Sequence, residues 1–142
     1  MRIKIFLMAA AVAFLAGCDT FYGVSRYVAV SEIPSRDLVE RSLRSVPEIN
    51  SVDYSELDPG SAYAYQIGYA SGSARGQIGS GSAQDKTKFF EISCWWINHV
   101  PAAQELRATR SLMDKVYAAL RDRCPKLPPA AELYETTRGL RE

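Results

Sequence analysis

Histidine is almost missing from this chain, since His99 is the only one among 142 residues. A single imidazole cannot build a zinc site without carboxylates or thiols, and as a general base it would need a nucleophile that the sequence does not identify. It lies just before an expected helix, where an exposed or capping role is the simplest interpretation. We therefore expect no metal, no cofactor and no catalytic residues, and hence a protein that is not an enzyme.

Long runs of one charge and low-complexity segments are also lacking. The chain has 17 basic and 16 acidic residues, and 47% of its residues are hydrophobic. This composition excludes an intrinsically disordered chain and a histone-like nucleic-acid binder, so no nucleic-acid partner is expected. It fits a single globular domain.

Long hydrophobic runs are confined to the N-terminus. Arg2 and Lys4 precede an uncharged run over residues 5–17. As a helix this run would measure about 20 Å, which is short of the ~30 Å hydrocarbon core of a bilayer. The pattern is typical of a signal peptide over residues 1–17 rather than of a stable membrane span.

The end of this segment, Leu15-Ala16-Gly17-Cys18, resembles the lipobox of bacterial lipoproteins. The resemblance implies cleavage before Cys18 and attachment of diacylglycerol and further acyl (palmitate) chains to that residue. It also implies a location in the cell envelope, with the domain anchored in the membrane through Cys18 and facing the periplasm. Asp19 resembles the retention signal of inner-membrane lipoproteins; the outer membrane is the alternative.

The rest of the chain predicts a short tether over residues 18–22, one domain over 23–124 and a proline-rich, poorly ordered tail over 125–142. Alternating and helical apolar patterns give the order strand, helix, three strands, helix. The strands are expected over 22–30, 49–56, 62–70 and 88–97, the helices over 35–46 and from Pro101 to about 124, and a mobile Gly/Ser-rich loop over 71–86. The simplest arrangement is an α+β fold, a four-stranded, mainly antiparallel sheet with both helices on one face. The first helix-to-strand segment loosely resembles ferredoxin-like domains, without their metal-binding Cys-x-x-Cys.

Cysteine is scarce as well, with three in the chain. Once Cys18 is assigned to the lipid, Cys94 and Cys124 remain in an oxidising compartment, which favours a disulfide. A straight helix to Cys124 would carry that residue away from Cys94, however, while bonded Cα atoms must approach within ~7 Å. Two buried thiols and an intermolecular bond are the alternatives.

Aromatic residues are concentrated on the expected strands. If the helices cover one sheet face, aromatic side chains remain on the other and form a partner or ligand surface, for which Tyr63, Tyr65, Tyr69 and Trp95 are the candidates. The alternative is that loops or the tail cover them. We expect a non-catalytic binding, accessory or scaffold component of the envelope, with an envelope protein partner or self-association; the alternative is a module that binds a small ligand or glycan through these aromatic residues.

Overall fold

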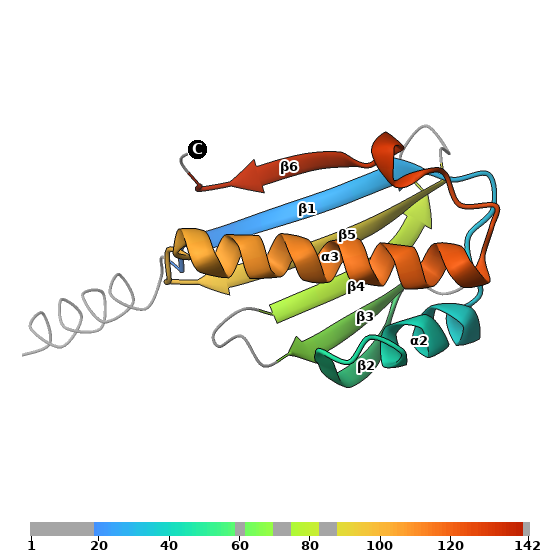
Figure 1. Ribbon diagram of the computed structural model, residues 1–142, viewed down its shortest axis with the longest axis horizontal. Helices are drawn as coiled ribbons and strands as arrows, with labels where there is room; N and C mark the ends of the chain where they lie inside the picture. The colour runs from blue at the N-terminus through green and yellow to red at the C-terminus, as the bar shows by residue number, and fades with distance from the viewer. Residues whose placement is uncertain (1–18, 59–61, 70–74, 83–87, 141–142) are drawn as a thin grey trace, which may run out of the picture.

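The computed structural model describes residues 19–58, 62–69, 75–82 and 88–140, and within these ranges the side chains of 54–58, 62–66, 69 and 75–82 are not described. The expected signal peptide and Cys18 lie outside the described residues. The chain folds in the order β1 (Phe21–Ala29), α2 (Arg36–Arg44), β2 (Ile49–Asp58), β3 (Ala62–Tyr69), β4 (Arg75–Ser82), β5 (Lys88–Ile97), α3 (Ala103–Arg123), η1 (Ala130–Glu132) and β6 (Tyr134–Arg138) (Figure 1).

The α+β class and the antiparallel sheet are confirmed, but the expected number of four strands is wrong. The sheet has six strands in the order β2-β3-β4-β5-β1-β6, and each neighbouring pair is antiparallel. Three strands separate β1 from β2, the two strands that flank α2. The arrangement therefore lacks the split βαβ unit of ferredoxin-like domains.

One of the two extra strands comes from the Gly/Ser-rich segment that was expected to be a mobile loop. Residues 75–82 form β4, whose backbone pairs with β3 on one side and with β5 on the other. Gly and Ser have low strand propensity, so a sequence pattern does not reveal such a strand. Its position between two partners, which is a tertiary effect, decides the outcome.

The other extra strand comes from the tail expected to be poorly ordered. After α3 the chain forms η1 and then β6, which pairs with β1 from Tyr134↔Tyr27 to Arg138↔Gly23. The expected tether is also part of the domain, because β1 begins at Phe21. The backbone N–H of Thr20 donates to Oδ1 of Asn98 at 2.8 Å, which fixes the chain even before β1.

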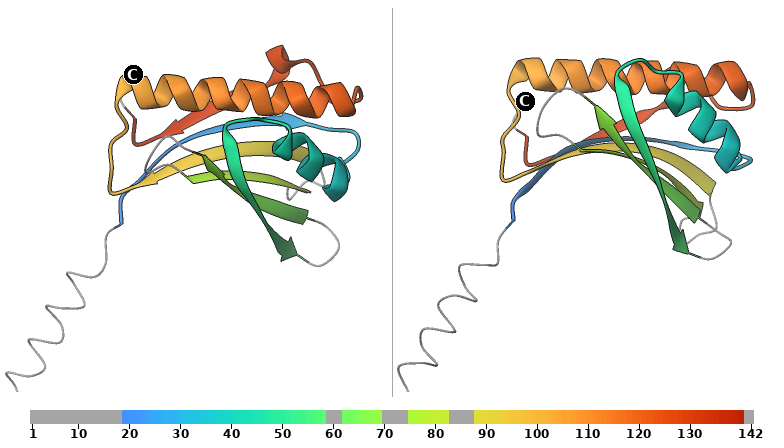
Figure 2. Two further views of the ribbon diagram at one scale, coloured as in Figure 1. Left: turned by 60° about the horizontal axis from the view of Figure 1, so that its bottom comes forward. Right: turned by 90° about the horizontal axis from the view of Figure 1, so that it is seen from below.

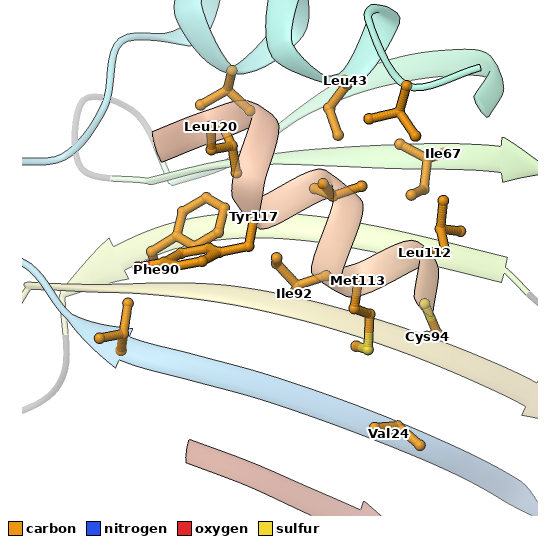
Figure 3. Close-up of a cluster of buried hydrophobic side chains, with 14 of the residues drawn as sticks. Val24, Leu43, Ile67, Phe90, Ile92, Cys94, Leu112, Met113, Tyr117 and Leu120 are labelled. Atoms are coloured by element: carbon orange, nitrogen blue, oxygen red, sulfur yellow. The ribbon is translucent and has the colours of Figure 1, made fainter. Parts of the chain in front are cut away.

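Both helices lie on one side of the sheet (Figure 2). Ser35 caps α2 by accepting a hydrogen bond from the backbone N–H of Leu38, and α3 runs without a break for 21 residues. The apolar core fills the space between these helices and the sheet (Figure 3). Its fully buried large side chains are Trp96, Tyr117, Phe90, Leu43, Ile67, Ile92, Met113, Leu120, Val24 and Val39.

Candidate functional site

The side of the sheet away from the helices, here called the uncovered face, is the candidate site. Strand residues alternate between the two faces. On β5 the buried positions Phe90, Ile92, Cys94 and Trp96 belong to the core. The intervening positions therefore lie on the uncovered face. With their partners on β1 and β6 they comprise Phe89, Glu91, Ser93, Trp95, Ile97, Phe21, Gly23, Ser25, Tyr27, Ala29, Tyr134, Thr136 and Arg138.

Trp95 packs on the backbone of Gly23, its direct partner in register. A Cβ at position 23 would lie 2.4 Å from Cε3 of Trp95 and 2.7 Å from Cζ3, which is too close for any side chain. Gly23 is therefore the residue that lets the six-membered ring of the indole lie against the strand. Trp95 stays half-buried while its neighbour Trp96 is fully buried in the core.

Two buried hydroxyl groups lie next to this pair. Ser25 and Ser93 face each other across β1 and β5, and their Oγ atoms are 2.9 Å apart. Oγ of Ser93 donates to Oε1 of Glu91 at 2.5 Å, so Ser25 is left as the donor to Ser93. Both hydroxyls are therefore satisfied within the protein, Ser93 by the Glu91 carboxylate and Ser25 by Ser93.

Among the described side chains, Tyr27 and Tyr134 form an exposed aromatic pair on the uncovered face. Their ring centroids are 5.0 Å apart with planes at 59°, and the residues are 38% and 58% exposed. The sequence pattern marks neither residue as part of a site. Tyr134 lies in the segment assigned to the tail, and only the pairing of β6 with β1 brings the two rings together.

Ion pairs on the opposite, helix-covered side fix β6 and therefore Tyr134. Arg26 on β1 bonds both Asp114 of α3 and Glu135 of β6, and Arg110 of α3 bonds Glu135 at 2.8 Å. Partial burial opposes ionisation of Glu135, but the hydrogen bonds from Arg26 and Arg110 outweigh it and hold the pKa of this carboxyl below its usual value. The charged cluster thus joins the last strand to the first strand and to the long helix.

The structure describes only part of the aromatic surface that the sequence predicts. Tyr63, Tyr65 and Tyr69 belong to β3 by their backbone, but their side chains lie outside the described part of the structure. Ile67, which the sequence pattern groups with them on one strand face, is buried in the core. Trp95 is on the uncovered face, and it is the one candidate of the four whose side chain the structure describes.

The expected disulfide between Cys94 and Cys124 is not formed, and both residues carry reduced thiols. In the core, Cys94 lies toward the Leu112 end of α3 rather than the Leu120 end (Figure 3), and Cys124 follows Leu112 by twelve residues, just past the end of this unbroken helix. Those residues span ~18 Å, well beyond the ~7 Å that bonded Cα atoms allow. The helix does run straight, which was the geometric objection to the bond.

His99 lies at the start of α3 and binds a carboxylate. Its Nε2 is 3.0 Å from Oε2 of Glu105, which also accepts the backbone N–H of Ala102 at 2.6 Å. The bond from Ala102 and then that from His99 hold the pKa of Glu105 below its usual value. Glu105 thus caps the start of α3 through the backbone N–H of Ala102, and His99 contacts this carboxylate rather than the helix backbone.

The described residues offer no obvious alternative site. They contain no cluster of three or more His, Cys, Asp or Glu residues that could hold a metal ion. No helix within the same residues has the length and hydropathy needed to cross a bilayer. A cleft of about 290 Å³ beside α3 and η1 is lined mainly by charged and small residues, namely Asp114, Tyr117, Ala118, Arg121, Asp122, Ala130 and Leu133.

Comparison with known proteins gives no family. No family model matches the chain, and no curated protein matches it. A conserved protein from Geobacillus kaustophilus is similar in structure, with 8% sequence identity and a TM-score of 0.42 over 82% of this chain and 99% of that chain. This likeness is too weak to support an inference about fold or function.

Proposed function

We propose that this chain is a lipid-anchored protein of the bacterial envelope that acts without catalysis, by binding a protein partner through the uncovered face. The anchor rests on the lipobox resemblance at Leu15-Ala16-Gly17-Cys18. The binding role rests on one observation, the exposed pair Tyr27 and Tyr134 on the sheet face opposite α2 and α3. Exposed tyrosines beside polar groups are typical of interface centres.

The geometry of the pair favours a protein partner over a sugar. Rings inclined at 59° form a wedge rather than the flat platform on which a sugar ring stacks. A wedge of this kind accommodates a protruding side chain from a partner, with exposed Thr136 and half-buried Glu91 nearby in register to supply hydrogen bonds. The partner is then an envelope protein or a second copy of the chain.

Substitution of the aromatic pair tests the binding role. The acylated protein in detergent should sediment or co-purify as a complex, and Tyr27→Ser with Tyr134→Ser should abolish that complex. A matched control is Thr136→Ser, which alters the same face without removing a ring. An unchanged complex in the double variant would refute the role of this face.

A small-ligand module is the second candidate, supported by Trp95. Its indole lies on Gly23 and is half-buried, so a ligand on the uncovered face would alter its fluorescence. In this role the protein should be a monomer whose tryptophan fluorescence responds to small molecules or glycans. The Trp95→Phe variant should not show that response. The fully buried Trp96 serves as the internal control.

The anchor has its own test. Labelled palmitate should be incorporated by the wild-type chain and not by Cys18→Ser, and the variant should leave the membrane fraction. Equal labelling of the two chains would refute the lipobox assignment.

A further inference from the structure

The first residues after Cys18 are bound to the corner between β5 and α3. Asn98 accepts the backbone N–H of Thr20 at Oδ1, donates its own backbone N–H to the carbonyl of Thr20, and donates Nδ2 to Oδ1 of Asp19. The three distances are all 2.8 Å. Asn98 holds a φ of 54°, the left-handed conformation that Asn tolerates better than most residues. These three hydrogen bonds therefore hold residues 19 and 20 against the corner.

This contact leaves almost no free tether. Consecutive Cα atoms are 3.8 Å apart, so Cys18 lies within about 4 Å of a residue held by the domain. A flexible tether over 18–22 would instead allow ~15 Å and free rotation of the domain. An acyl chain on Cys18 must enter the bilayer directly beside the corner.

Large apolar side chains are exposed at this same end, here called the anchor end and defined by Asp19, Phe21, Ile97 and Val100. Phe21 and Ile97 are direct partners in register and are 40% and 42% exposed, and Val100 is 62% exposed. They are three of the five large apolar residues exposed among those the structure describes. The guanidinium of Arg138 lies 6.0 Å from the Phe21 ring centroid, which adds a cation beside the apolar group.

We infer that the anchor end is a membrane-contacting surface that holds the domain in one fixed orientation on the bilayer that receives the acyl chains of Cys18. Apolar side chains beside a cation match the boundary between acyl chains and anionic head groups. The acyl chains supply the affinity, whereas the Asn98 contact and the exposed side chains set the orientation. β1 then rises from the bilayer, and six residues of strand place Tyr27 and Tyr134 about 20 Å above the membrane end of the sheet.

This inference depends on the proposed anchor, and its test separates the two. The acylated full-length chain is reconstituted into phosphatidylethanolamine and phosphatidylglycerol vesicles, with a nitroxide at Val100→Cys in a Cys124→Ser background. The matched control is a nitroxide at Ala131→Cys, an exposed position on η1 near the other end of β1 (Figure 1). Relaxation by oxygen and by a water-soluble nickel chelate then reports immersion of each label.

We expect the label at position 100 to be shielded from nickel and accessible to oxygen, and the label at position 131 to show the reverse. Asn98→Gly removes the side-chain contacts to residues 19 and 20 while allowing the positive φ. In this variant the chain should still float with the vesicles, but the shielding at position 100 should be lost.

Each contrary result has a distinct meaning. Flotation with both labels equally accessible to nickel would overturn the fixed orientation and leave the anchor standing. Failure to float, or equal flotation of Cys18→Ser, would overturn the anchor itself. Shielding at position 100 that persists without vesicles and grows with protein concentration would show that a second copy covers this end, and would also overturn the inference.

Discussion

At the scale of single residues, Gly23 is a position where one added carbon should destabilise the fold. Gly23→Ala places a methyl group 2.4 Å from a carbon of Trp95, so the indole or the strand must move. We expect a loss of about 1 to 3 kcal/mol in the free energy of unfolding, measured by urea denaturation. Ala29→Val, on the same strand at an exposed position, should change it by less than about 0.5 kcal/mol.

A double-mutant cycle tests whether the contact with Trp95 causes the loss of stability in Gly23→Ala. In a Trp95→Leu background the smaller side chain can retreat from position 23, so Gly23→Ala should cost less than it does alone. Equal costs in the two backgrounds would assign the loss to the backbone of β1 rather than to this packing.

The two thiols give a second residue-scale prediction. Intact mass should be the same with and without reductant, because Cys94 and Cys124 are not bonded to each other. In the native protein an alkylating reagent should modify half-buried Cys124 and reach Cys94 only on unfolding, since Cys94 is 1% exposed. A 2 Da difference, or Cys94 modified first, would contradict the structure.

At the scale of elements, β6 depends on charge as well as on backbone pairing. Glu135→Gln weakens its bonds to Arg26 and Arg110 and should lower the free energy of unfolding by about 1 to 3 kcal/mol at neutral pH. The matched control is Glu40→Gln, which affects only a surface pair with Arg44 and should cost about 0.3 to 0.5 kcal/mol.

The same carboxylate makes the effect depend on pH. Its pKa in the folded protein lies below the ordinary value of 4.5, so its ionised form stabilises the fold. That contribution is complete above 4.5 and is lost as the pH falls through the lowered pKa. The stability difference between wild type and Glu135→Gln should therefore shrink below about pH 4.5; a constant difference down to pH 3 would exclude the ion pairs as its source.

The elements also show what the sequence could and could not predict. β5 and both helices were predicted nearly to the residue, because regular apolar spacing marks one buried face. β4 and β6 were missed, because their residues are mostly small or polar and their strand state depends on partners distant in the chain. The same cause applies to the candidate site. Trp95 could be assigned to it from the alternation of residues in β5, whereas Tyr134 joins it only because β6 pairs with β1.

At the scale of the whole molecule, the hydrophobic core and the proposed binding surface lie on opposite faces of one sheet. The core lies between the sheet and the helices, so the uncovered face can present aromatic groups without exposing that core. The sequence anticipated this division from the two faces of β5. It could not anticipate how closely residues 19 and 20 are bound to Asn98, because a left-handed Asn and its partners 78 residues away leave no local pattern.

The two neighbours of β1 in the sheet predict different rates of amide hydrogen exchange along this strand. β1 is paired on one side with β5, which is backed by the core, and on the other side with the short, exposed strand β6. If β6 opens separately, alternate amides of β1 lose their acceptors while the others keep them. Exchange followed by NMR should therefore show two classes in β1, slow for amides bonded to β5 and faster for those bonded to β6. Glu135→Gln should accelerate the faster class alone, whereas one common rate along β1 would mean that the sheet opens as a single unit.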